Sequence, residues 1–409
     1  MKRIFINFIR FFISDRVYRK LKRRYLIWKS EPTPIVKNPE KIYDKVYHIK
    51  EATWEKMQIP AIYMMTQKCN IECYHGEQDI LCIQNAKVYN ISDVVLTSKG
   101  AVWDKAYRQD FSKIIPLDKN YLKHDINNVY LQKYKQSVHV QGICLSLLGV
   151  HADIWAHFLI QFLPKLFYAE EAGLFKQHIS ILIPKYKDAN IIEMVNMVIG
   201  KYNTIDIIEV ENEIEYCCDT LMYIPTASYI GNDLFYTSPF DTVIPVDVIS
   251  RIQNSIVTPL IEKVKSNPVK YEKLYLPRKN SGYRTTSNIQ EVDEYFRAKG
   301  FHFVEGSQMT MEEKADMFMH AKVIAGPYSS AWINTIFCRG AKGLILTNLP
   351  KSIETYYLTL AGENNIEFMH VQGYDLDFNH QCDFYMPMDR VEAAYEQFIG
   401  YKYETDNNK

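Results

Sequence analysis

Hydrophobic and polar positions divide the chain into an irregular first part and a long region in which strands and helices alternate. Between residues 60 and 150 the pattern predicts short strands and turns, with clear strands at 86–90 and 94–97. From residue 151 apolar side chains recur every three or four positions, which indicates a buried helix. Pro164 interrupts this pattern, so we expect the helix to kink or split there.

Two α/β stretches follow, on either side of a Pro-containing segment at 225–245 and a predicted helix at 246–265. The elements expected before this junction are a strand, a helix and a strand at 179–183, 189–202 and 205–210. The strands expected after it lie at 273–276, 301–304, 322–325 and 344–347, with short helices between them, including 331–337. Strands that alternate with helices are typical of a parallel, doubly wound sheet.

The length of the chain also indicates two domains, because 409 residues exceed one ordinary core. We predict an N-terminal α/β domain at 31–250 and a Rossmann-like domain at 251–390. A basic amphipathic helix at 1–30 precedes them, and a C-terminal helix and tail at 391–409 follow.

Composition excludes some classes of function. Lys and Arg together number 48, as do Asp and Glu, which argues against nucleic acid as a partner. The eight cysteines include no CxxC pair, and Cys69 and Cys73 supply at most half of a metal site, so we expect none. Without a cleavable signal peptide, the chain is expected to be a reduced, cytoplasmic protein.

The first thirty residues depart from this charge balance. Ten Lys and Arg side chains face a single acid, Asp15, with Ile and Phe between them. A transmembrane helix needs about 20 apolar residues, and Arg10 interrupts this run. We therefore expect residues 1–30 to lie on an anionic membrane surface, as a peripheral anchor on its inner face. The alternative is a basic helix packed on the protein's own core.

The candidate ligand-binding residues are in the loops that follow two strands of the second α/β stretch. Ligands of open parallel sheets bind outside the carboxyl ends of the strands. The loop 277–284 carries Arg278, Lys279 and Arg284, which suit a diphosphate clamp. The alternative is a solvated basic loop. The turn 326–330 leads from a strand into a helix, whose N-terminus can hold an anion. Ser329 and Ser330 would bind phosphate or only cap the helix.

A series of weak motifs runs through the same stretch. An arginine that ends a strand, a second arginine, an asparagine, a Gly-Phe turn and a later Gly-Pro turn occur in this order: Arg278, Arg284, Asn288, Gly300-Phe301, Gly326-Pro327, then Ala331, Asn334 and Phe337. This segment, 274–347, resembles the C-terminal half of glycosyltransferase family 61, whose members are also described as capsular-polysaccharide biosynthesis proteins. Upstream, His157-Phe158 and the Leu-Pro-Lys-Leu run at 163–166 resemble the family's His-aromatic helix and its Leu-Pro-Arg end. Tyr328-Ser329 stands where the family has His-Gly.

The resemblance implies a GT-B-like fold, in which two Rossmann-like domains with parallel sheets face an interdomain cleft. Domain 31–250 would take the acceptor and domain 251–390 the nucleotide sugar. The implied reaction is an inverting, metal-independent transfer of a hexose or pentose to a saccharide or lipid-linked saccharide in capsular or other surface polysaccharide synthesis. The nucleotide sugar is a substrate, and no cofactor is expected. The implied donor-binding residues are Arg278, Lys279, Arg284, Asn288, Gly326, Tyr328, Ser329, Ser330 and Asn334.

An inverting transfer also needs a general base to take the proton of the acceptor hydroxyl. His157 is the expected base, because imidazole titrates near neutral pH, although a histidine on so apolar a helix can equally be a packing residue. Asp153, four residues earlier, is expected to orient or replace it. The Asp375-Leu376-Asp377 pair holds a metal in a different glycosyltransferase fold, but here it lies in a late loop, so we expect no metal.

Two other functions stay open at this point. A polysaccharide pyruvyl transferase has a similar two-domain architecture, needs basic loops for its acidic donor, and would be protected by phosphoenolpyruvate. A non-catalytic relative that acts as an assembly partner is compatible with the change at Tyr328-Ser329.

Overall fold

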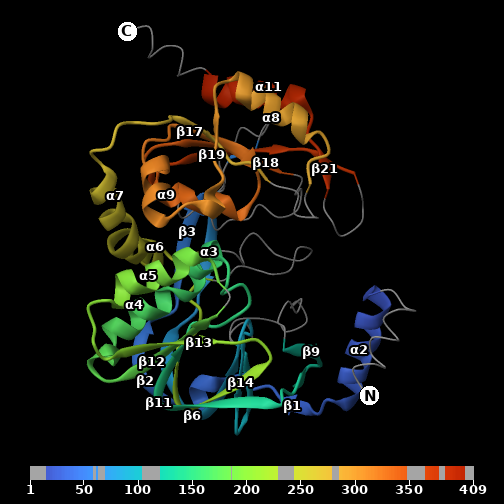
Figure 1. The fold of residues 1–409 in the computed structure, drawn as a ribbon, viewed down its shortest axis with the longest axis vertical. Coiled ribbons are helices and arrows are strands. Elements are labelled where there is room, and N and C mark those ends of the chain that lie inside the picture. The colour runs from blue at the N-terminus through green and yellow to red at the C-terminus, as the bar shows by residue number, and fades with distance from the viewer. Residues whose placement is uncertain are drawn as a thin grey trace.

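Two large sheets organise the computed structural model, one above the other in Figure 1, with helices α3, α5, α6 and α9 between them. The structure describes residues 15–58, 61–62, 70–103, 120–185, 187–228, 244–278, 285–347, 364–376 and 383–400.

The N-terminal sheet has the strand order β13-β12-β11-β14-β6-β7-β8, and β2 pairs with β6 beside this path. Its strands are β2 (Asp44–Lys50), β6 (Gln78–Tyr89), β7 (Val94–Thr97), β8 (Gly100–Trp103), β11 (Gln136–Ser146), β12 (Ile179–Pro184), β13 (Ile205–Val210) and β14 (Ile214–Tyr223). Pairing is parallel from β13 to β14 and antiparallel between β14, β6, β7, β8 and β2. The prediction of a parallel sheet is therefore correct for only half of this sheet. The other half includes β6, β7 and β8, whose short connections allow only antiparallel neighbours.

Helical segments follow the first two parallel strands: α3 (Trp155–His157), the π-helical turn η4 (Phe158–Phe162), α4 (Pro164–Glu171) and α5 (Ala189–Ile199). The predicted split at Pro164 is confirmed. This residue has no N–H to give to the preceding turn, and it begins α4 while a π turn closes the helix before it. Asp188 caps α5, its side chain accepting a hydrogen bond from the Asn190 N–H at 2.9 Å.

The C-terminal sheet is entirely parallel, with the order β16-β15-β17-β18-β19-β4. Its strands are β4 (Ala61–Ile62), β15 (Lys273–Tyr275), β16 (His302–Phe303), β17 (Val323–Pro327), β18 (Lys342–Thr347) and β19 (Glu367–Gln372). The four strands predicted here are confirmed within two residues at each end. The edge strand β4 comes from the first part of the chain, so the predicted N-terminal domain also contributes to this sheet.

Helices α8 (Ile289–Ala298), α9 (Met311–Phe318), η9 (Ser330–Phe337), α11 (Met388–Tyr395) and η10 (Glu396–Gly400) flank this sheet. The helix expected at 331–337 is the 3-10 helix η9, whose residues include the β-branched Ile333, Thr335 and Ile336, poor α-helix formers. The C-terminal helix begins at Met388. Its apolar face joins a cluster with α8 and strands of the C-terminal sheet.

A nearly continuous helical segment connects the two halves: α6 (Val246–Ile252), η7 (Gln253–Val257) and α7 (Thr258–Val264). Its residues Ile249 and Ile256 belong to one apolar cluster that also contains Phe162 of the first half and Phe337 of the second. The two sheets therefore share a core, which fixes the loops at their facing edges relative to each other.

Smaller elements lie outside the two sheets: β1 (Pro32–Pro34), η1 (Pro39–Lys41), β3 (Thr53–Gln58), β5 (Asn70–His75), β9 (Tyr121–His124), β10 (Asn128–Leu131), η5 (Leu174–Lys176), η8 (Gly306–Gln308), β20 (Tyr374–Asp375) and β21 (Phe384–Tyr385).

The basic segment forms helix α2 (Asp15–Lys29), at the edge of the molecule beside β9 (Figure 1). Within the described part of this helix no side chain is buried, and Arg23 donates a hydrogen bond from Nη2 to the Leu122 carbonyl oxygen of β9 at 2.9 Å. Among the described residues, no helix is long and apolar enough to span a lipid bilayer.

Candidate functional site

The C-terminal sheet reverses its strand order between β15 and β17, because β16 lies on one side of β15 and the later strands on the other. Ligands of such sheets bind at this reversal, outside the carboxyl ends of the two strands. Arg278 follows β15, and Ser329 and Ser330 follow β17. The Arg278 Nη1 donates a hydrogen bond to the Tyr328 carbonyl oxygen at 3.3 Å, so the two predicted loops meet here.

Gly326 allows this close approach of β17 to the end of β15. Its φ is +151°, and a Cβ atom there would lie 2.5 Å from the carbonyl oxygen of Leu276. Only glycine fits a backbone in this conformation at this distance from its neighbour. Gly326 is thus a structural residue of the site and does not itself line it.

Replacing Gly326 with Ala is expected to lower the free energy of unfolding by about 2–4 kcal/mol, through the strained φ and the clash with Leu276. Urea unfolding followed by circular dichroism measures this loss. Gly340 is the matched control, since its φ is +68° and a Cβ atom there would meet nothing within 4 Å. Equal losses in Gly326→Ala and Gly340→Ala would show that the close contact contributes nothing.

The N-terminal sheet presents a second set of loops, at the carboxyl ends of β11 and β12. Its parallel strands also reverse order, with β12 on one side of β11 and β14 on the other. Asp153 follows β11, and Asp188, which follows β12, donates its N–H to the Asp153 carbonyl oxygen at 3.1 Å. The loops join the other half directly, because the Trp155 Nε1 lies 3.1 Å from the sulfur of Met311.

A cleft of about 550 Å³ lies between the two sets of loops. This volume is within the range of small-molecule sites. Five of the predicted site residues line it: Asp153, Arg278, Ser329, Ser330 and Asn334. The cleft is also lined by Trp155, Asp188, Glu305 and Lys314.

Asn334 lines this cleft from a buried position, with 4% of its surface exposed. Its Nδ2 donates to the Ala331 carbonyl oxygen at 2.9 Å, which fixes the amide plane. Its Oδ1 receives no hydrogen bond from any residue that the structure describes. A ligand hydroxyl or amide would satisfy that oxygen.

Other predicted residues lie away from the cleft. Tyr328 is buried in the shared core, with its carbonyl oxygen bound to Arg278. Asn288 joins the segment before α8 to Met386, donating from Nδ2 at 2.8 Å and accepting at Oδ1 at 3.0 Å. In this structure Tyr328 and Asn288 stabilise the fold and do not line the cleft. Lys279 and Arg284 lie outside the described residues.

His157 lies at the end of α3, half-buried and just beyond the cleft-lining segment 153–156. Its Nδ1 is 2.8 Å from the Gln161 Oε1, and its ring centroid is 4.6 Å from that of His151. His151 has a left-handed backbone, with φ 70°. The structure thus brings Asp153 to the cleft and leaves His157 outside its lining, and the role of each stays a prediction.

Sequence reasoning missed Lys314, a buried lysine on α9 that lines the cleft. Its Nζ lies 4.6 Å from the centre of the Trp155 ring. Burial lowers the pKa of this amine from 10.5 to about 8, against the opposing effects of Asp188 and Glu193. One signal was present in the sequence. Met311, Ala315 and Phe318 predict the buried face of α9, and position 314 belongs to it by helical spacing.

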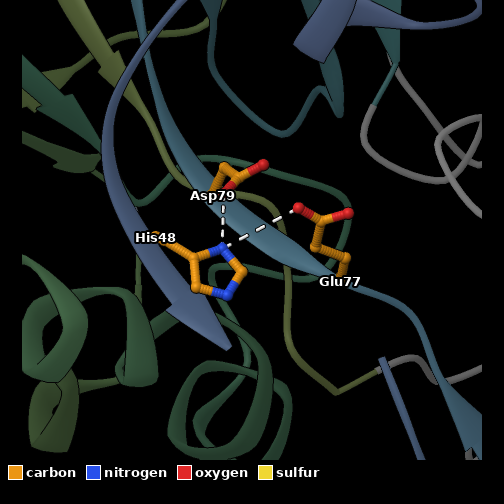
Figure 2. A group of neighbouring side chains, drawn as sticks. All are labelled: His48, Glu77 and Asp79. Atoms are coloured by element: carbon orange, nitrogen blue, oxygen red, sulfur yellow. Dashed lines mark hydrogen bonds and ion pairs between the residues drawn. The ribbon is translucent and has the colours of Figure 1, made fainter. Parts of the chain in front are cut away.

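One group elsewhere has the residue types of a metal site. His48 on β2 points toward Glu77 and Asp79 (Figure 2), with its Nδ1 2.9 Å from Asp79 and 3.8 Å from Glu77. The pKa of His48 is raised, chiefly by its hydrogen bond to Asp79. Lys45 lies 2.6 Å from Asp79 and 3.1 Å from Glu77 and so balances both carboxylates. We therefore assign no metal to this group, and none of its members lines the cleft.

The other metal motif that the sequence suggested is incomplete in the structure. Asp377 lies outside the described residues, so the pair Asp375-Leu376-Asp377 is not defined.

Comparison with known proteins gives one family match. Residues 155–345 match the family model described as Glycosyltransferase 61. The match begins at α3 and ends within β18, and it includes Arg278, Ser329, Ser330 and Asn334 at the cleft. No curated protein matched the chain. The segment 155–345 is thus similar to the glycosyltransferase 61 family, in agreement with the resemblance that the sequence motifs indicated.

Proposed function

We propose that this protein transfers a sugar from a nucleotide-sugar donor to a saccharide acceptor in the cleft between its two sheets, in a GT-B-like arrangement. The observation that carries the proposal is that both sheets turn the carboxyl ends of their strands, at the points where strand order reverses, toward one cleft. The family match supplies the reaction class.

The donor's diphosphate is assigned to the C-terminal side of the cleft. Arg278 brings a guanidinium there, which suits phosphate oxygens by charge and by its forked geometry. Ser330, at the start of η9, and the Asn334 amide add hydrogen-bonding groups. These groups would stabilise the charge that develops on the leaving diphosphate, the task that a metal performs in other transferases.

Asp153 is our first candidate for the general base, because it lines the cleft from the N-terminal side. In an inverting transfer the acceptor oxygen attacks the anomeric carbon as the bond to the diphosphate breaks. The proton of the acceptor hydroxyl passes to the base, and the electron pair of the broken bond leaves with the diphosphate. His157 would act instead only if a change in the loop at 153–157 brought its ring into the cleft.

A screen of thermal stability tests the proposed substrate class, because a ligand that binds the native state raises the Tm. We expect at least one of UDP, GDP and ADP to raise the Tm, and phosphoenolpyruvate to leave it unchanged. A shift with phosphoenolpyruvate alone would support pyruvyl transfer. A protein that no nucleotide stabilises would contradict the proposal and favour a non-catalytic assembly partner.

We propose further that α2 binds the anionic inner face of a membrane, where a lipid-linked acceptor for capsular or other surface polysaccharide would lie. Four apolar side chains follow one face of this helix and are exposed: Val17 by 45%, Leu21 by 50%, Tyr25 by 51% and Trp28 by 78%. Lysines and arginines flank them at positions 20, 22, 23, 24 and 29. An exposed apolar face bordered by cations suits the boundary between acyl chains and anionic headgroups.

Replacing Trp28 with Ser is expected to weaken binding to phosphatidylglycerol liposomes about tenfold or more, because a buried aromatic ring contributes about 1.5–3 kcal/mol. Co-sedimentation at low and high salt measures this binding. Trp54 on β3, which is 65% exposed, is the matched control, and Trp54→Ser should bind as the wild type does. Equal binding by Trp28→Ser and the wild type would contradict the membrane proposal.

A further inference from the structure

Lys314 is a buried cation in the wall of the cleft. Only 3% of its surface is exposed, and its Nζ lies 4.6 Å from the centre of the Trp155 ring. No hydrogen bond or ion pair joins its ammonium to any residue in the described part of the chain. An isolated buried ammonium is costly, and the burial that removes water from it also strengthens its attraction to any anion that enters the cleft.

None of the described acids around Lys314 forms an ion pair with its ammonium, so the ammonium can pair with an anion that enters the cleft. From α5 and its cap, Glu193 and Asp188 act on it without forming an ion pair. Asp153, Glu305 and Arg278 line the same cleft. From α7, Lys263 pairs at 4.0 Å with Glu312, and both are exposed. The nearest acids therefore hold the amine protonated at neutral pH, although burial lowers its pKa to about 8.

We propose that Lys314 is a donor-binding residue, whose ammonium, beside the Trp155 ring in the wall of the cleft, pairs with an anionic group of the nucleotide sugar. This inference rests on the proposed function. Two sources offer that anion: the diphosphate common to all such donors, and the carboxylate of a uronic acid. In either case Arg278 and Lys314 act as two cations on one ligand, Arg278 from the loop after β15 and Lys314 from helix α9.

Because the residue at position 314 is a lysine, we expect the affinity for the donor to depend on pH. In the free protein the amine is protonated below about pH 8 and neutral above it, and only the protonated form attracts the anion. The protonated fraction falls about tenfold between pH 7 and pH 9, so the affinity should fall by up to the same factor. Arginine stays protonated over this range, so Lys314→Arg should retain its affinity at pH 9.

Isothermal titration calorimetry of the full chain with UDP, GDP and ADP, at pH 7 and pH 9, tests the inference. Lys314→Met is expected to weaken binding at pH 7 by about ten- to a hundredfold and to remove the pH dependence. Its Tm should equal or exceed that of the wild type, because it removes a buried charge that has no hydrogen bond or ion pair with any described residue. Lys322→Met, an exposed lysine just before β17, loses the same charge and should bind as the wild type does.

UDP-glucose and UDP-glucuronate separate the two sources of the anion. Weaker binding of UDP by Lys314→Met assigns the ammonium to the diphosphate. Weaker binding of UDP-glucuronate alone assigns it to the sugar carboxylate. If the wild type binds nucleotides, and Lys314→Met binds every one of them equally well with the same pH profile, the inference is overturned while the proposed function stands. If the wild type binds none of them, both are overturned.

Discussion

Replacing Asp153 with Asn is expected to lower kcat by a factor of about 10²–10⁴, the usual contribution of a positioned general base. The amide keeps the shape of the carboxylate but cannot accept the acceptor's proton. The backbone contact of Asp153, which accepts from the Asp188 N–H at 3.1 Å, is unchanged by this substitution. Nucleotide affinity and Tm should therefore stay near the wild-type values, while turnover of a nucleotide sugar, followed by release of nucleoside diphosphate, falls.

His157→Gln is the comparison that separates the two predicted bases. Gln preserves a hydrogen bond to Gln161, 2.8 Å from the histidine Nδ1, but it cannot titrate. Because His157 does not line the cleft, this variant should lose far less turnover than Asp153→Asn. A large loss in His157→Gln with near-normal turnover in Asp153→Asn would return the role of base to the histidine.

Arg278→Ala is expected to weaken nucleoside diphosphate binding by about 10- to 150-fold, which corresponds to about 1.5–3 kcal/mol for hydrogen bonds to a charged group. The structure holds this guanidinium at the reversal of strand order by its bond to the Tyr328 carbonyl oxygen. Calorimetry measures the loss, and Arg278→Lys should restore part of it, because lysine keeps the charge without the fork.

Arg297→Ala provides the matched control for this prediction. Arg297 is an arginine of the same half of the chain, on α8, where its guanidinium stacks 3.8 Å from the centre of the Phe303 ring. It does not line the cleft, so its loss should leave nucleotide affinity unchanged. A similar loss of affinity in both variants would mean that Arg278 acts through general charge and not through contact.

Local patterns in the sequence predicted most of the C-terminal half. Its strands are short apolar runs bounded by turn residues, and in the structure Thr310 and Glu313 form a capping box at the start of α9. Pro164 marked a helix boundary because the missing N–H acts locally. Placing Arg278 and the turn 326–330 at one sheet edge required only that the strands be parallel neighbours, which they are.

Features that depend on distant parts of the chain were not predictable in the same way. The alternation of residues in β6 and β7 indicates strands but not the direction in which they pair, so the antiparallel half of the N-terminal sheet was missed. The strand β4 has two residues and no pattern of its own. Lys314 gains its surroundings only when Trp155, more than 150 positions earlier, packs over it.

The direction of side chains within the site also depends on tertiary structure. The segment containing Asp153 and His157 is divided between a turn, a single turn of α-helix and a π turn, so helical spacing alone does not say which of the two faces the cleft. The contact of Trp155 with Met311 fixes this segment against the C-terminal half.

A crystal structure of the full chain with the nucleoside diphosphate that raises its Tm most would test the central claim directly. The account predicts the diphosphate in the cleft between the two sheets, with at least one phosphate oxygen within hydrogen-bond distance of Arg278. The space between the diphosphate and Asp153 should be large enough for a sugar ring. A diphosphate bound at any other part of the molecule, with the cleft free of ligand, would contradict it.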